Sequence, residues 1–117
     1  MPASFDPTSI EVTPEQTQAA FADGSAQVVD VRTPHERAAE RIDDALHIEM
    51  QQLGANAGKI DTDRPVIFYC HTGARSAMAA QAFRGIGVDA YSMAGGIERW
   101  LNEGRPLAPA DGVVPGH

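Results

Sequence analysis

At 117 residues the chain is long enough to bury one hydrophobic core without disulfides, so we expect a single domain over residues 1–117. Its formal net charge of −7 and its nine scattered Lys and Arg residues argue against nucleic acid as a partner. The sequence contains no apolar run of the ~20 residues that a membrane span requires, and its first residues lack a secretory signal. We therefore expect a cytoplasmic protein with no membrane partner.

The first predicted elements are a helix and a strand. Thr13 can cap a helix and Gln16 can complete a capping box, which predicts a helix over residues 14–23 that ends at Gly24. The β-branched run at residues 27–31 then predicts a short buried strand.

The same helix-start pattern returns immediately after this strand. Thr33 and Glu36 form a second potential capping box, which opens a short helix through about Glu40. Beyond it, residues 45–48 suggest a short strand, and residues 50–59 suggest broken helical turns.

Two strands and two helices are expected in the second half of the chain. Residues 66–69 are all apolar, which is typical of a central strand in a parallel sheet. Helical spacing of apolar side chains predicts that the next helix, which Gly87 ends, buries Ala79, Ala82, Phe83 and Ile86.

A further strand over residues 88–92 and a helix over 97–101 complete the pattern. We expect the core to span about residues 10–107 and residues 108–117 to form a flexible tail. Alternating strands and helices predict an α/β domain with a mainly parallel sheet between helical layers, and ligands bind such sheets at the carboxyl ends of the strands.

The only cysteine, Cys70, follows the apolar strand and opens a loop that leads into a helix. Backbone amides and the positive helix end lower the pKa of a thiol in such a position, which favours the nucleophilic thiolate. One cysteine cannot form an internal disulfide or a structural zinc site, so we expect no metal and no cofactor. The alternative is that Cys70 is simply a small buried apolar residue.

The residues that follow Cys70 each suit a binding loop. Gly73 allows positive φ angles and close ligand approach, and Ser76 could hydrogen-bond the sulfur or cap the helix. His71 and Thr72 could donate hydrogen bonds at the rim, although His71 is equally compatible with a surface loop. Arg75 brings a permanent positive charge, directed either to a ligand or to a carboxylate.

Three motifs together resemble the rhodanese-like sulfurtransferase family, in its short single-domain form. They are an Asp-x-Arg-x-x-x-Glu pattern at Asp30, Arg32 and Glu36, the Cys-x4-Arg-Ser loop at residues 70–76, and Gly-Gly-Ile-Glu-Arg-Trp at residues 95–100. The resemblance covers about residues 10–107. It implies a five-stranded, mainly parallel sheet flanked by helices on both faces, and a Cys70 persulfide as the intermediate of sulfur transfer.

The resemblance also implies partners and residue roles. The donor would be a small sulfur compound such as thiosulfate, and the acceptor cyanide or a thiol such as glutathione or thioredoxin; we expect a monomer or weak dimer. The substrate-binding loop would consist of His71, Thr72, Gly73, Ala74, Arg75 and Ser76. Asp30, Arg32 and Glu36 would brace this loop, and Arg32 and Glu36 could pair directly if both lie on one helical turn. The alternative for these three is an exposed ion-pair network of little energetic value.

The sequence departs from the family pattern at two places. Glu40-Arg41-Ile42 replaces the common Gly-His-Ile, and His71 stands where many members carry Arg. A less cationic rim predicts modest affinity for thiosulfate, so the donor could instead be a persulfide or polysulfide.

Two other functions fit parts of the pattern. Cysteine phosphatases and arsenate reductases also combine Cys with Arg, but the usual phosphatase loop is Cys-x5-Arg, one residue longer than here, and internal resolution needs further cysteines. A rhodanese-like module could also relay sulfur or bind partners without independent turnover.

Overall fold

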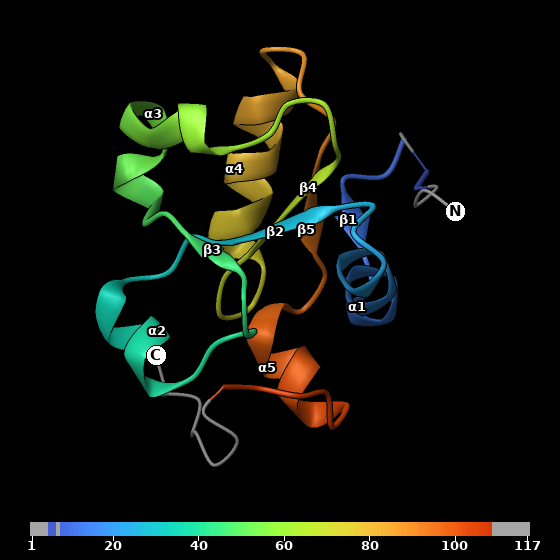
Figure 1. Ribbon diagram of the computed structural model, residues 1–117, viewed down its shortest axis with the longest axis vertical. Coiled ribbons are helices and arrows are strands. Elements are labelled where there is room, and N and C mark those ends of the chain that lie inside the picture. The colour runs from blue at the N-terminus through green and yellow to red at the C-terminus, as the bar shows by residue number, and fades with distance from the viewer. Residues whose placement is uncertain (1–4, 7, 109–117) are drawn as a thin grey trace.

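The computed structural model describes residues 5–6 and 8–108, and Figure 1 shows a twisted sheet with helices packed on its two sides. The strands of the described chain are β1 (Glu11–Val12), β2 (Gln27–Asp30), β3 (Leu46–His47), β4 (Val66–Tyr69) and β5 (Ala90–Met93). The helices are α1 (Pro14–Ala22), α2 (Pro34–Ala39), α3 (Leu53–Asn56), α4 (Ala74–Arg84) and α5 (Gly96–Asn102), and short 3₁₀ turns, Met50–Gln52 and Ala57–Lys59, flank α3. None of the helices in this part of the chain has the length and apolar character to cross a membrane.

The five described strands form one sheet in the order β1-β5-β4-β2-β3, and every pairing is parallel. The expected α/β class with a five-stranded parallel sheet is therefore confirmed. The apolar strand β4 lies at the centre and is buried along its whole length, because helices cover both faces. The two-residue strand β1 was not predicted, whereas the equally short β3 falls within the strand predicted at residues 45–48.

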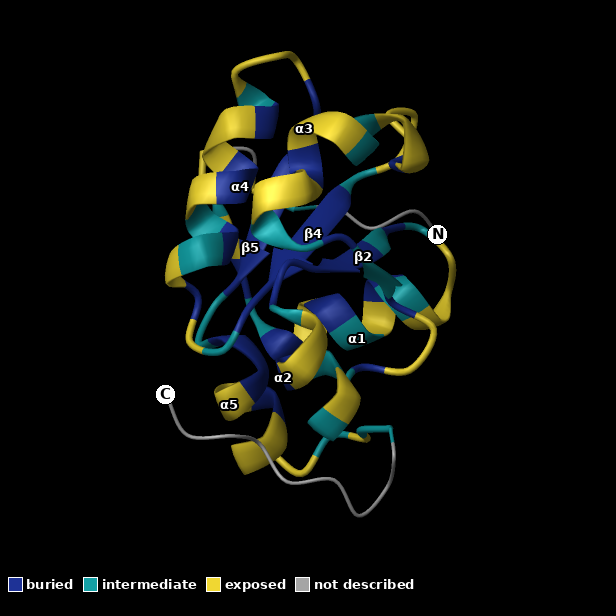
Figure 2. Cartoon of the chain, turned by 90° about the vertical axis from the view of Figure 1, so that its left-hand side faces the viewer, coloured by how far each residue is buried: buried dark blue, intermediate teal, exposed yellow. Residues whose placement is uncertain are grey.

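Side chains alternate between two hydrophobic clusters, one on each face of the sheet. In β4, Phe68 packs with Ala79 and Phe83 of α4, whereas Ile67 packs on the opposite face with Trp100 of α5. Figure 2 shows the buried strands between the partly exposed helices. Consequently, α4 and α5 cover opposite faces of the sheet.

Both predicted capping boxes are present. The Thr13 hydroxyl accepts from the Gln16 amide at 3.0 Å and the Gln16 side chain accepts from the Thr13 amide at 2.8 Å. The Thr33 and Glu36 pair makes the same reciprocal contacts at the start of α2. Each box satisfies two amides that the first helical turn would otherwise leave unpaired.

The predicted buried stripe of α4 is half wrong. Ala79 and Phe83 are buried, but Ala82 is exposed and Ile86 lies in the turn after the helix with 72% of its surface exposed. The small residues Ser76 and Ala80 take the buried positions instead. In a helix that contains so much alanine, the apolar pattern does not define one face.

The expected flexible tail is wrong at its first residue. Ala108 forms an antiparallel bridge with Arg41, in which the two backbone N–H to O distances are 2.8 Å and 2.7 Å. The indole Nε1 of Trp100 also donates to the carbonyl of Pro106 at 2.8 Å. The chain is thus held through residue 108, and residues 109–117 lie outside the described residues.

Candidate active site

The candidate nucleophile Cys70 lies directly after the central strand β4, at the carboxyl edge of the sheet. Only 1% of the residue is exposed, so the thiol sits beneath its loop rather than on the surface. Gly73 turns the chain into α4 with a φ of 114°, a conformation that glycine adopts at low cost. The loop therefore bends back over the sulfur.

Two groups lie within hydrogen-bonding distance of the sulfur. The amide of Gly73 donates to Cys70 Sγ at 3.1 Å, and Ser76 Oγ lies 3.5 Å from the same atom. These contacts come from the loop and the first turn of α4, where amides point toward the carboxyl edge of the sheet.

These contacts act on the pKa of the Cys70 thiol. Burial raises the pKa, but the Ser76 hydroxyl and the amides of Ser76, Gly73 and Arg75 outweigh this effect and lower it below the ordinary value. The thiolate is therefore favoured by hydrogen bonding rather than by exposure to water.

Ser92 of β5 completes the hydroxyl network and was missed in the sequence analysis. Its Oγ lies 2.8 Å from Ser76 Oγ, and both residues are fully buried. Ser76 has a single hydroxyl proton, which it can donate either to the Gly73 carbonyl, 3.2 Å away, or to Cys70 Sγ, while its oxygen accepts from Ser92. A buried hydroxyl in the apolar run of β5 was the available signal, because buried polar groups almost always have a partner.

Helix α5 holds the loop from the other side. The amides of Ile97 and Glu98 donate to the carbonyls of Cys70 and His71 at 2.9 Å and 3.1 Å. Gly96 packs so closely that a Cβ at this position would lie 2.3 Å from the His71 oxygen. The Gly-Gly motif thus allows a close backbone contact that sets the height of the loop.

Arg75 is directed to a carboxylate. Its guanidinium nitrogens donate to the two Glu36 carboxylate oxygens at 2.9 Å and 3.0 Å. Only 3% of the Glu36 side chain is exposed. This bidentate pair joins α2 to the first turn of α4. Arg32 precedes α2, so Arg32 and Glu36 do not lie on one helical turn and the condition for their direct pairing is not met.

Arg32 instead forms a buried network with Asp30 and Glu40. It donates to both Asp30 oxygens at 2.9 Å, to Glu40 Oε1, and to the Glu40 carbonyl at 2.7 Å. The Tyr69 hydroxyl donates to Asp30 at 3.1 Å, which ties the network to the residue before Cys70. All of these side chains are at least 98% buried, so the alternative of an exposed network is excluded.

Glu40 is the second residue that the sequence analysis missed. Within the described chain its Oε2 is buried without a hydrogen-bond partner. Burial, together with the negative charges of Asp30 and Glu36, raises the pKa of this carboxyl more than Arg32 lowers it.

The remaining loop residues lie around the mouth of the site. Thr72 and Ala74 are exposed, and His71 is half-buried. Of the six predicted loop residues, Gly73 and Ser76 contact the sulfur, and the side chain of Arg75 is directed to Glu36. Across residues 5–6 and 8–108, no group of three His, Cys, Asp or Glu side chains is arranged to hold a metal ion.

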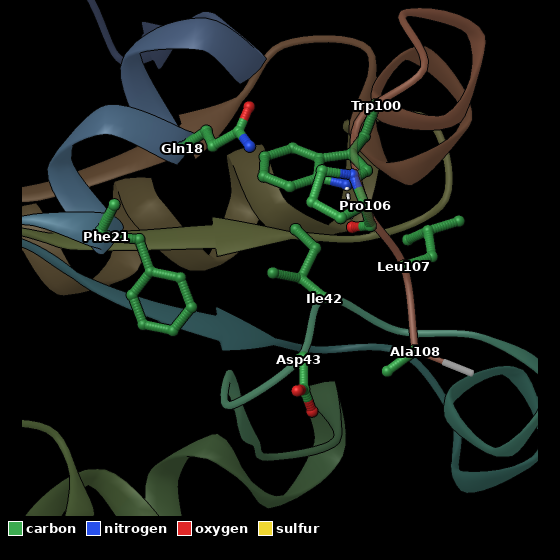
Figure 3. A pocket seen from close by; sticks show the side chains of 9 residues that line it. Gln18, Phe21, Ile42, Asp43, Trp100, Pro106, Leu107 and Ala108 are labelled. Carbon is green, nitrogen blue, oxygen red and sulfur yellow. Dashed lines mark hydrogen bonds between the residues drawn. The ribbon is translucent and has the colours of Figure 1, made fainter. Parts of the chain in front are cut away.

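An apolar groove of about 270 Å³ lies away from this loop (Figure 3). Phe21 of α1, Ile42, Trp100 and Leu107 line it, and Asp43 lies at its edge. No residue of the segment 70–76 contributes to its lining.

The fold and the site define an α/β domain that holds a single cysteine among backbone amides at the edge of a parallel sheet. Residues 13–103 match the rhodanese-like domain family. The thiosulfate sulfurtransferase GlpE of Actinobacillus succinogenes is 34% identical over 106 residues, which cover 90% of this chain and 96% of that protein. A protein of Allochromatium vinosum named sulfurtransferase is 36% identical over 86 residues, which cover 73% and 80% of the two chains.

A crystal structure of a rhodanese-related protein from Thermoplasma volcanium has the same fold. It superposes with a TM-score of 0.78 at 24% identity, over 84% of this chain and 96% of the other. The chain belongs to the rhodanese-like domain family.

Proposed function

We propose that this protein is a sulfurtransferase that carries one sulfane sulfur atom on Cys70, from a donor of the thiosulfate or persulfide class to cyanide or a thiol. The observation that carries the proposal is the contact of the Gly73 amide and the Ser76 hydroxyl with Sγ. Donors at these positions stabilise a negative sulfur both before and after transfer. The names of the two sulfurtransferase relatives support the same general activity.

In the first step the Cys70 thiolate attacks the sulfane sulfur of the donor. A bond forms between the two sulfur atoms, the bond to the donor breaks, and its electron pair leaves with the donor, as sulfite in the case of thiosulfate. The amides of Gly73, Arg75 and Ser76 that lower the pKa of Cys70 increase the fraction of reactive thiolate.

In the second step the acceptor attacks the outer sulfur of the persulfide. The S–S bond breaks and its electron pair returns to Cys70 Sγ, while the acceptor becomes thiocyanate or a persulfide. The lowered pKa of Cys70 makes it a better leaving group than an ordinary thiol in this step, because thiols of lower pKa leave faster.

The charge around the site bears on the choice of donor. The positive charge of Arg75 is bound to Glu36 through two hydrogen bonds, so it is largely neutralised before a donor arrives. A dianion such as thiosulfate gains less from such a site than from an unpaired arginine. We therefore propose that persulfides and polysulfides are used at least as well as thiosulfate.

The test is thiocyanate formation from cyanide with thiosulfate, mercaptopyruvate or glutathione persulfide as the donor. We expect turnover by the wild-type protein with at least one donor and none by Cys70→Ser. Equal turnover by both proteins would exclude Cys70 as the sulfur carrier. A persulfide that forms on the wild type and is not discharged to cyanide would indicate a relay module instead.

A further inference from the structure

A serine hydroxyl lies within the largely apolar layer between β5 and α4. Ser92 is fully buried and lies directly beside Phe68 of β4 in the sheet. Phe68 faces α4, which packs against β5 (Figure 1), and residues paired in neighbouring strands point to the same side. Ser92 therefore also points toward α4, and it meets the first turn of that helix at Ser76.

The proton of the Ser92 hydroxyl has one destination. Within residues 5–6 and 8–108, Ser92 Oγ has a single hydrogen-bond partner, which is Ser76 Oγ at 2.8 Å. This is the usual length of a hydrogen bond between two hydroxyl groups. A buried hydroxyl that donates to nothing loses the hydrogen bond that it makes to water in the unfolded chain, which is costly. Ser92 is therefore the donor of this bond, and Ser76 is the acceptor.

The proton of Ser76 then has two acceptors within reach in the loop. Its oxygen lies 3.2 Å from the Gly73 carbonyl oxygen and 3.5 Å from Cys70 Sγ. A hydrogen bond to an ionised acceptor is roughly twice as strong as one to a neutral acceptor. The Ser76 proton is thus drawn to Sγ when Cys70 is a thiolate, and to the carbonyl when Sγ is neutral. The bond from Ser92 stays in place in both states.

Ser92 strengthens the contact between Ser76 and the sulfur in two ways. Its hydrogen bond holds the Ser76 oxygen in place from across the interface between β5 and α4. A hydroxyl that accepts a hydrogen bond is also a better donor, since linked hydrogen bonds strengthen one another by about 10–30% per bond. Without the Ser92 hydroxyl, Ser76 would keep its own proton but lose the group that fixes and polarises it.

We propose that Ser92 is a positioning residue for sulfur transfer, which acts on Cys70 only through Ser76; this inference rests on the sulfurtransferase function proposed above. Before transfer, and again when the electron pair of the S–S bond returns to Sγ, the negative charge lies on Sγ and the Ser76 proton stabilises it. While the persulfide exists, the outer sulfur carries the charge and the Ser76 proton turns to the Gly73 carbonyl. No proton leaves either serine in these steps, so no further reactant is needed.

The experiment is a double-mutant cycle on the full chain, with Ser92→Ala, Ser76→Ala and the double variant. The first readout is the pH profile of iodoacetamide alkylation, which reports on Cys70 alone because it is the only cysteine. The second readout is the rate at which cyanide discharges the Cys70 persulfide. The matched control is Thr17→Val, because Thr17 is also a fully buried hydroxyl residue but donates to the Thr13 carbonyl at the start of α1.

We expect Ser92→Ala to move the alkylation midpoint to higher pH and to slow the discharge about twofold, because the Ser76 donor is weakened but not removed. Ser76→Ala should move the midpoint further and slow the discharge about fivefold, which is the effect of one lost hydrogen bond. The double variant should match Ser76→Ala, because Ser92 reaches the sulfur only through Ser76. Thr17→Val should lower the urea midpoint of unfolding and leave both readouts at their wild-type values.

Three results would overturn the inference. They are an alkylation midpoint in Ser92→Ala that equals that of wild type, effects of the two alanine substitutions that simply add in the double variant, and an equal shift in Thr17→Val, which would indicate a general loss of stability. A wild-type chain that forms no persulfide would instead overturn the proposed function. The alkylation profile does not require a persulfide, so the two failures are distinguishable.

Discussion

The close contact of Gly96 with the Cys70 loop leads to a sharp prediction for Gly96→Ala. Gly96 is the first residue of α5 and has a φ of 61°. A Cβ there would lie 2.3 Å from the His71 carbonyl oxygen and 2.6 Å from the Cys70 oxygen. Both neighbours are backbone atoms of the loop, so they can yield only if the loop itself moves.

The magnitude follows from two effects. A left-handed conformation costs a residue with a Cβ about 1–2 kcal/mol, and an overpacked site costs about 1–3 kcal/mol more. The matched control is Gly104→Ala, since Gly104 has a φ of 74° and no atom within 4 Å of its potential Cβ. The control carries only the first cost, so Gly96→Ala should be the less stable variant by about 1–3 kcal/mol.

The assay is urea unfolding, followed through the fluorescence of Trp100, the only tryptophan in the chain. With a typical m-value of about 1–3 kcal/mol per molar urea, the two midpoints should differ by roughly 1 M. Gly96→Ala should also lose sulfurtransferase turnover under conditions where it is still folded. Equal midpoints and equal turnover for the two variants would refute the close packing of α5 against the loop.

Three further predictions concern single side chains. Ser76→Ala should raise the pKa of Cys70, because the Ser76 hydroxyl contributes most to lowering it; an unchanged midpoint in the pH profile of iodoacetamide alkylation would contradict this. Because the pKa of Glu40 is raised, the folded state binds its proton more tightly than the unfolded state, so wild type should lose stability relative to Glu40→Gln as the pH rises above the ordinary carboxyl value of 4.5. Urea unfolding of both proteins at several pH values measures this, and a stability difference that does not change with pH would contradict it. Glu36→Gln should lower the free energy of unfolding by about 1–3 kcal/mol, because it weakens the contact with Arg75. An unchanged urea midpoint would show that the Arg75–Glu36 ion pair does not stabilise the fold.

Local signals account for what could be predicted from the sequence. Thr13 and Thr33 mark the starts of α1 and α2 because a capping box involves residues only three positions apart. The apolar run before Cys70 predicted the central strand, since a strand covered on both faces has no polar side to display. Together they located the loop at the correct edge of the sheet.

Contacts between distant residues explain what was not predicted. Arg75 meets Glu36 across 39 positions, and Ser76 meets Ser92 across 16. Glu40 was recognised only as a departure from the family pattern, because its partner Arg32 lies eight residues away and outside one helical turn. The burial of Ala80 rather than Ala82 depends on how α4 sits on the sheet, which alanine spacing does not encode.

The central claim is that Cys70 carries the sulfur atom, and intact-mass spectrometry tests it most directly. After incubation with thiosulfate or glutathione persulfide and removal of excess donor, the wild-type chain should gain about 32 Da, the mass of one sulfur atom. Cyanide should remove this mass, and Cys70→Ser should never acquire it. A wild-type chain that gains no mass with either donor, or a Cys70→Ser chain that gains the same mass, would contradict the account.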